Sequence, residues 1–169
     1  MKTTGYALRE AIKQQELLRE TAARSFNTTL KVFPGEDKDS PTAVMDAMLR
    51  AETAIARLQT AQMRYNLMVT VQVDGSKSPL AVAVKLVGGV ARAEKMWRSA
   101  AAPKEDRYGY RNDDERDPNQ VRASATISTQ ETLKHATVMA KRSAALRQAI
   151  AVANATEVEI EDLEPSLFL

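Results

Sequence analysis

Apolar residues recur in steps of three and four along four long segments of the chain, and this spacing is the period of one helix face. The stripe in the second segment is the clearest, and it consists of Val44, Met48, Ala51, Ile55, Leu58, Gln62 and Tyr65. Ser40 and Pro41 precede it as a capping hydroxyl and a first-turn proline. We predict helices over about residues 4–26, 41–66, 79–101 and 129–154.

The side chains that could fill a core are mostly small. Hydrophobic residues make up 44% of the sequence, but aromatic residues make up only 5% and much of the remainder is alanine. Small side chains bury little area each, so thin helical layers suit this chain better than a wide core. The sequence predicts a mainly α fold, with four long helices in an antiparallel hairpin or coiled-coil arrangement and short extended or β connectors. We expect one helical domain over residues 1–169.

The connectors give weaker signals. Asn27–Asp39 contains a Pro-Gly turn, and Thr29–Phe33 is a candidate short strand. Met68–Val73 is rich in β-branched residues and is followed by Asp74-Gly75, which alone would indicate a hairpin. Because Ser78-Pro79 resembles a helix start, we interpret Met68–Val73 as an extended connector. We expect the two helices that it joins to form the core pair.

The third helix is apolar around more than half its girth as far as Val90, so we expect it to be the most buried helix. Gly88-Gly89 in its middle favours close approach of another helix, and the alternative is a kink or a ligand-facing notch. After the polar segment, Val121–Ile127 is a candidate strand, and Ser128 with Glu131 forms a capping box. We expect the tail, residues 155–169, to dock on a neighbour or a second subunit.

Composition also bears on the compartment. The sequence has no cysteine, which removes disulfides and thiolate metal sites. The N-terminal residues lack the apolar run of a signal peptide. The longest apolar stretch, Pro79–Ala91, contains Lys85 and is shorter than the ~20 residues that a membrane-spanning helix needs. We predict a soluble, cytoplasmic protein with no membrane partner.

A polar crossover over residues 104–123 separates the third and fourth helices, and arginine and aromatic side chains gather in and before it. The set consists of Arg92, Trp97, Arg98, Arg107, Tyr108, Tyr110, Arg111 and Arg122. Guanidinium forks beside flat rings suit a small anionic ligand such as a nucleotide, and the same residue types are enriched in protein interfaces. The further alternative is a surface loop held by internal Arg–Asp pairs. Single-stranded nucleic acid also uses aromatic platforms, but the neighbouring acids argue against it.

No pattern of a catalytic or metal site stands out. His135 is the only histidine, and we expect it on a helix surface or between helices. Nucleophile-elbow, phosphate-loop and dinucleotide motifs are lacking in the sequence. The acidic run Asp113-Asp114-Glu115 with Asp117 does not have EF-hand spacing, so we interpret it as solvated. We predict no enzyme, no catalytic residue, no metal and no cofactor.

Several landmarks occur together in a familiar order: LREAI…LLRE before FPGED, DSPTAVMDAMLRAETAIARLQTAQMRYN before Asp74-Gly75 and LAVAV, then Asp106-Arg107-Tyr108, and finally LRQAIAVANATEV. In this order the chain resembles the septicolysin-like family of small bacterial helical proteins. It departs from that family at Ala155, where a tryptophan is usual, and in a longer, more charged insert after Tyr108. The resemblance implies a coiled-coil protein without a settled activity, and the family name suggests a cytolysin.

Three functional hypotheses remain from the sequence. The first is a non-enzymatic helical homo-oligomer that serves as a structural or interaction module, because narrow apolar stripes need cover from a second copy. The alternative is a sequestering protein that binds a small anionic metabolite or nucleotide near a subunit junction. Cytolysin-like membrane activity is the third and weakest hypothesis, because the chain shows neither a signal peptide nor a cationic amphipathic helix.

Overall fold

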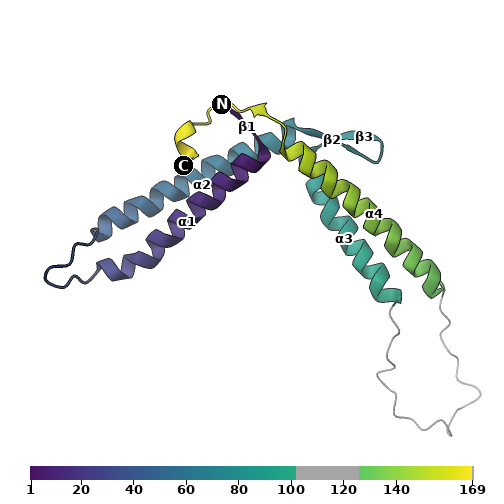
Figure 1. Cartoon of the computed structure of the whole chain (residues 1–169), viewed down its shortest axis with the longest axis horizontal. Coiled ribbons are helices and arrows are strands. Elements are labelled where there is room, and N and C mark those ends of the chain that lie inside the picture. Colours follow the sequence, from purple (N-terminus) through teal and green to yellow (C-terminus); the bar gives the residue numbers. More distant parts are fainter. Residues whose placement is uncertain (102–125, 169) are drawn as a thin grey trace, which may run out of the picture. The chain divides into compact units, whose positions relative to one another are not determined.

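The computed structural model describes residues 1–101 and 126–168 of the chain. In these ranges the fold is mainly α, as predicted, with helices α1 (Gly5–Thr29), α2 (Pro41–Met68), α3 (Leu80–Ala101) and α4 (Thr129–Asn154) (Figure 1). The predicted strand at Thr29–Phe33 is wrong, because α1 continues to Thr29 and an irregular loop follows. The crossover at 104–123 and most of the strand predicted at 121–127 lie outside the described residues.

The short strands form two antiparallel pairs. β1 (Lys2–Thr3) pairs with β4 (Val158–Glu159), which brings the two ends of the chain together (Figure 1). β2 (Thr70–Val73) and β3 (Ser76–Pro79) form a hairpin whose turn residues Asp74 and Gly75 have φ of 49° and 83°. Two successive positive φ angles are what a two-residue hairpin turn of the Asp-Gly type requires. The interpretation of this segment as an extended connector is therefore wrong.

The chain divides into two compact units, and the first consists of Met1–Val84 and Gln148–Leu169. In this unit α1 and α2 run antiparallel and pack side by side (Figure 1). Both begin at a capping side chain: Thr4 Oγ1 accepts from the Ala7 amide, and Ser40 Oγ accepts from the Ala43 amide, each at 3.1 Å. The partner of α2 is thus α1, and the prediction that the following helix would be its core partner is wrong.

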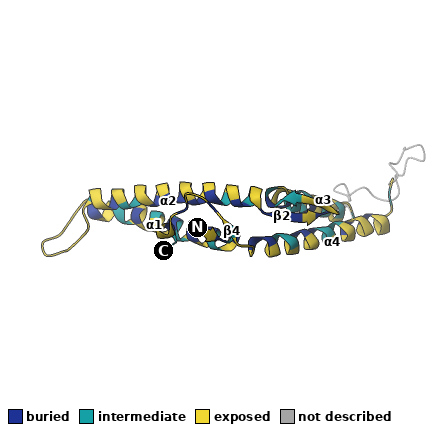
Figure 2. Ribbon diagram, turned by 90° about the horizontal axis from the view of Figure 1, so that it is seen from above, coloured by how far each residue is buried: buried dark blue, intermediate teal, exposed yellow. Residues whose placement is uncertain are grey.

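In α2 the core follows the predicted stripe, and α1 packs a set of buried residues against it. The buried residues of α1 are Gly5, Leu8, Ala11, Gln15, Ala22 and Thr29, and those of α2 are Val44, Ala51, Ala54, Ile55, Leu58, Ala61 and Tyr65. Figure 2 shows α2 with buried residues along one side and exposed residues along the other. Alanine is frequent in both sets, so the two helices share a thin core.

The C-terminal tail packs on the same unit. Ile160, Leu163 and Leu167 are buried, and Gln15 Nε2 donates a hydrogen bond to the Leu167 carbonyl at 3.5 Å. Leu167 belongs to a 3₁₀ helix, η1 (Pro165–Leu167). The tail therefore docks on a neighbouring part of its own chain, which is one of the two outcomes that the sequence left open.

The second unit, Lys85–Arg147, contains most of α3 and α4. The predicted capping box is present at the start of α4: Ser128 Oγ accepts from the Glu131 amide at 3.2 Å, and the Ser128 amide donates to Glu131 Oε2 at 3.1 Å.

Of the α3 residues, Leu80, Ala83 and Val90 are buried, whereas Val82 and Val84 are exposed. The prediction that this helix is the most buried is wrong, because these three are its buried residues, whereas α2 has seven.

Candidate functional site

Three of the eight residues in the predicted arginine and aromatic set are described, and all three lie on α3. Trp97 stacks on His135 of α4, with ring centroids 4.6 Å apart and an interplanar angle of 23°. This contact makes His135 an interhelical residue, one of the two placements predicted for it. The other members of the set, Arg107, Tyr108, Tyr110, Arg111 and Arg122, lie outside the described residues.

The arginines of α3 do not join the Trp97 ring in one site. Arg98 Nε donates to Glu94 Oε1 at 2.8 Å, one turn back along the same helix. At about 100° per residue, Arg92, Trp97 and Arg98 leave α3 in directions roughly 100–140° apart. A single small ligand on the described part of α3 would therefore contact only part of this set.

Among the described residues, no neighbouring helix packs closely enough to require glycine at positions 88 and 89. A Cβ atom built on Gly88 would have the Arg92 guanidinium as its nearest described neighbour, at 3.6 Å, and one on Gly89 would meet the same group at 3.9 Å. These are ordinary van der Waals distances. The interpretation of the two glycines as a site of close helix approach finds no support in this arrangement; instead the Arg92 side chain lies near their bare backbone.

Signals of catalytic chemistry are weak in the described ranges. Histidine, aspartate and glutamate residues form no group of three there that could hold a metal ion. A groove of about 310 Å³ between α2 and the tail is lined by both acids and bases, among them Arg64 and Asp162. Arg57 at its edge donates to Glu164 at 2.7 Å, and Arg64 lies 4.0 Å from Asp162. The basic groups of this groove already hold the tail.

The side of α2 that faces away from the core carries a second apolar stripe. We call this set the outer stripe, and it consists of Met45, Leu49, Ala56, Met63 and Leu67. Leu49, Met63 and Leu67 are each more than half exposed. On a helix of ~100° per residue, the outer stripe lies about 150° around α2 from the core stripe. Apolar residues at spacings of seven and four on an exposed face are typical of helices that pack against another helix.

The charged neighbour nearest to the outer stripe is already paired within the chain. Glu52 Oε1 lies 3.6 Å from Arg19 Nη1 of α1. Thr53 and Thr60, on the other flank, use their hydroxyls to donate to the carbonyls of Leu49 and Ala56 at 2.9 Å each. Both threonines thereby satisfy their polar hydrogens locally, which leaves the outer stripe without a strongly hydrated group at its centre.

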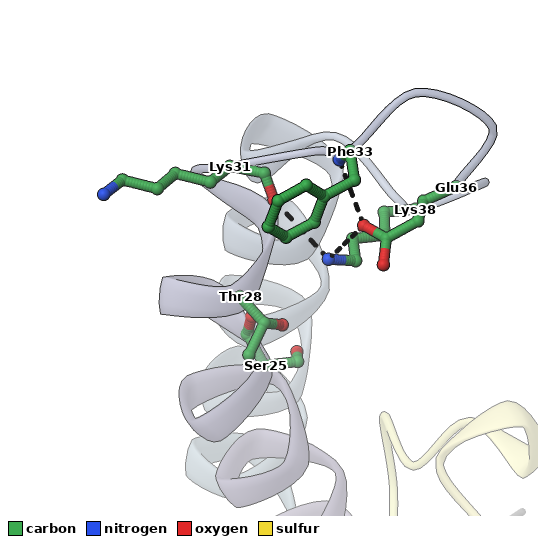
Figure 3. Close-up of polar contacts among 6 residues, drawn as sticks. All are labelled: Ser25, Thr28, Lys31, Phe33, Glu36 and Lys38. Atoms are coloured by element: carbon green, nitrogen blue, oxygen red, sulfur yellow. Dashed lines mark hydrogen bonds and ion pairs between the residues drawn. The ribbon is translucent and has the colours of Figure 1, made fainter.

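The loop between α1 and α2 presents a second exposed apolar group. Phe33 is 70% exposed, and it is held by a turn in which the Glu36 amide donates to the Phe33 carbonyl at 3.1 Å. The Glu36 carboxylate in return accepts from the Phe33 amide at 3.1 Å and from Lys38 Nζ at 2.8 Å (Figure 3). The hydrogen bond from Lys38 lowers the pKa of Glu36. The turn thus fixes the backbone that carries Phe33.

Sequence reasoning missed the outer stripe, although its signal is present. Leu49, Ala56 and Met63 repeat every seven residues, in a phase different from the core stripe. A search for a second phase within the same helix would have found them. The Phe33 turn was recognised only as a break, because the Pro-Gly pair indicates a turn without indicating what it exposes.

No helix in residues 1–101 or 126–168 combines the length and the apolar character needed to cross a lipid bilayer. No protein-family model matches the chain, and no curated protein matches it significantly. Its fold is similar to that in a crystal structure described as a functionally unknown conserved protein from Corynebacterium diphtheriae, with a TM-score of 0.66 and 18% sequence identity. The match covers 94% of this chain and all of the other. At this identity the likeness concerns the fold, and the septicolysin-like resemblance stays a prediction.

Proposed function

We propose that the protein is a non-enzymatic helical module that works by self-association, as a homo-oligomer. The observation that supports this proposal is the outer stripe of α2, in which three of the four large side chains are more than half exposed. Exposed single apolar residues are ordinary, but a stripe at helical spacing indicates an uncovered packing face. Covering it removes apolar area from water at about 25 cal/mol per Å².

The thin core adds to this argument. Alanine makes up five of the thirteen buried residues of α1 and α2, and large apolar side chains make up only five, so the contact between the two helices buries limited apolar area. A two-helix layer buries much more apolar area when a third or fourth helix covers its free side. A second copy of the same chain supplies such helices. An interaction module built in this way needs no catalytic group.

The test is the mass of the full-length chain in solution, measured by size-exclusion chromatography with multi-angle light scattering over a range of concentrations. We expect a mass that is a multiple of 18.6 kDa and that falls on dilution. A mass of 18.6 kDa at every concentration would refute self-association.

A second candidate is the binding of a small anionic ligand such as a nucleotide, and the Trp97–His135 ring pair favours it. A flat ring pair offers a stacking face for a base. Titration of the protein with ATP and with cyclic mononucleotides would test this through the emission of Trp97, the only tryptophan. Saturable quenching is expected; an unchanged emission up to millimolar nucleotide would exclude the candidate.

A further inference from the structure

Positive charge is concentrated in the second unit. Its described residues, 85–101 and 126–147, include eight lysines and arginines and two glutamates, a net charge of +6. The first unit has eleven basic and fourteen acidic residues, a net charge of −3. Residues 102–125, which hold the acids that argue against nucleic acid in the sequence, have five basic and six acidic residues and so change the balance by one charge. The net charge of +2 for the whole chain therefore combines a basic and an acidic unit.

Most of this positive charge has no acid nearby to offset it in the described part of the unit. Glu94 pairs with Arg98 at 2.8 Å, and Glu131 accepts hydrogen bonds from Ser128 in the capping box. Two acids can neutralise at most two of the eight positive charges. A domain with such an excess on its helices attracts polyanions, and clustered lysine and arginine are the electrostatic footprint of nucleic-acid binding.

Three of the basic residues share one face of α3. Lys85, Arg92 and Lys95 are all exposed, and we call them the basic face. At ~100° per residue they leave the helix within about 80° of one another. Val90, which is buried, points about 160° away from Arg92. The basic face is therefore the side of α3 that its own unit leaves open.

Two glycines make the basic face flat. Gly88 and Gly89 precede Arg92 by four and three residues, the positions over which a helical side chain leans. The Arg92 guanidinium accordingly lies 3.6 Å and 3.9 Å from Cβ atoms built on them. A glycine inside a helix costs about 1 kcal/mol relative to alanine, and no described helix packs closely enough to require either one. A flat cationic surface lets an extended anionic partner approach the helix closely.

We propose that the basic face of α3 binds the phosphate backbone of double-stranded nucleic acid without reading its sequence. Lysine and arginine are common partners of phosphate oxygens, and such contacts carry no sequence information. The three cations span about 15 Å of helix axis, and a duplex presents one negative charge per ~1.7 Å of its own axis. Lys134 and Lys141, exposed on α4, add to the potential that attracts the polymer. This inference does not depend on self-association.

A duplex fits the basic face better than a single strand or a lipid surface does. Proteins hold single strands by stacking bases on aromatic rings. Trp97 points about 140° away from Arg92 and stacks on His135, so the basic face offers no ring. A helix on a lipid surface inserts large apolar side chains from the face opposite its cations. On α3 that opposite face includes Val90, which is buried within the protein.

The first test titrates the full-length protein into fluorescently labelled duplex DNA and follows the anisotropy. Three neutralised phosphates predict that the affinity falls about 40-fold between about 50 and 200 mM salt. A second duplex of unrelated sequence should bind with the same affinity. Single-stranded DNA of the same length and vesicles of phosphatidylserine are the competing probes, and both should bind more weakly than the duplex.

The second test locates the contact with two variants of equal charge. Arg92→Gln with Lys95→Gln removes two cations from the basic face, and Lys13→Gln with Arg24→Gln removes two exposed cations from α1. The first pair should weaken duplex binding at least tenfold and should reduce the salt effect to about fourfold, because about one phosphate contact remains. The second pair should change the affinity less than about twofold. Circular dichroism checks that the helices of both variants are intact.

A third variant changes the shape of the basic face and keeps every charge. Gly88→Leu places a bulky side chain between Lys85 and Arg92, and leucine is a better helix former than glycine. It should weaken duplex binding at least tenfold while the thermal unfolding temperature stays the same or rises. Wild-type affinity in this variant would place the contact on another surface and would overturn the inference.

The remaining outcomes also decide the inference. An unchanged anisotropy at about 100 μM protein and about 50 mM salt would overturn it, since non-specific duplex binding is usually tighter than that. Equal losses in the two charge variants would show a response to net charge alone and would overturn it as well. Tighter binding to single strands or to phosphatidylserine vesicles would assign the basic face to that partner instead. The light-scattering mass of the wild-type chain bears on the proposed self-association only.

Discussion

The hydroxyl of Tyr65 in α2 lies 2.7 Å from the backbone carbonyl oxygen of Ala153 in the last turn of α4. The same hydroxyl lies 2.8 Å from the carbonyl of Thr156, so its single proton is shared between two acceptors. Carbonyls at the end of a helix have no amide within the helix to satisfy them. Tyr65 is fully buried, and this burial raises the pKa of its phenol. The side chain therefore joins α2 to the end of α4 and keeps the hydroxyl in its donating form.

Replacing Tyr65 with phenylalanine should lower the free energy of unfolding by about 1–3 kcal/mol. The ring stays, but the Thr156 carbonyl loses the hydroxyl and the Ala153 carbonyl keeps the Thr156 amide at 3.1 Å, and a polar group left short of its partner in a buried site costs that much. Urea denaturation followed by circular dichroism measures the change. Tyr6→Phe is the matched control, because Tyr6 also donates to a carbonyl of α4, that of Ala151 at 3.2 Å, but is 49% exposed. Its effect should stay within about 0.5 kcal/mol. Equal effects of the two substitutions would contradict the role assigned to Tyr65.

Gly5 and Gly88 should respond in opposite ways to substitution by alanine. A Cβ atom on Gly5 would lie 2.8 Å from Cε1 of Tyr65 and would overlap the Asn154 side chain. Gly5→Ala should therefore destabilise the protein by about 1–3 kcal/mol, as overpacking does. Gly88→Ala meets only ordinary contacts, and an alanine inside a helix is favoured over glycine, so it should stabilise by about 0.5–1 kcal/mol. Chemical denaturation of both variants checks the signs, and a stabilised Gly5→Ala protein would refute the crowding at this position.

The helices could be predicted because their signals are local. The seven-residue stripes gave the phase of α1 and α2, and Ser40 with Pro41 and the Ser128–Glu131 box marked two helix starts that the structure contains. The hairpin at β2 and β3 was missed because Ser78-Pro79 resembles a capped helix start. In the structure Pro79 ends β3, and the Leu80 amide donates to the Val69 carbonyl at 2.8 Å.

The contacts that hold the unit together could not be predicted in the same way. Arg9 Nη2 donates to Asn154 Oδ1 at 3.0 Å, across a separation of 145 residues. The need for glycine at position 5 depends on that same Asn154. A two-residue strand such as β1 has no periodicity to detect, since its partner β4 lies at the other end of the chain. Such pairings arise from the packing of the helices, and no local pattern in the sequence predicts them.

The ion pair between the tail and α2 makes a prediction about pH. The Arg57 guanidinium donates to Glu164, and this hydrogen bond lowers the pKa of that carboxyl. Because the pKa is lower in the folded protein, the stabilising contribution of the pair is present above the ordinary glutamate pKa of about 4.3. It is lost as the pH falls through the lowered value.

Carbon-13 NMR titration of the Glu164 carboxyl should therefore give a midpoint below the ordinary glutamate value. Arg57→Gln should bring the midpoint back toward that value. Salt at about 1 M should do so in part, because both side chains are exposed and the pair is screened. Arg64→Gln is the control, since Arg64 faces Asp162 and should leave the Glu164 midpoint nearly unchanged. An ordinary midpoint in the wild-type protein would contradict the pairing.

The contact between Trp97 and His135 can be read out by fluorescence, because the chain has one tryptophan and one histidine. His135→Ala removes the ring that covers one face of the indole, at a centroid distance of 4.6 Å. The indole then meets more water, so its emission should shift to longer wavelength and its quenching by acrylamide should increase. His135→Phe keeps a flat ring in place, and stacked or offset aromatic pairs are favourable by about 0.5–1.5 kcal/mol. This variant should retain the protection of Trp97 from acrylamide. If His135→Ala and the wild-type protein are quenched equally, the two rings do not stack in solution.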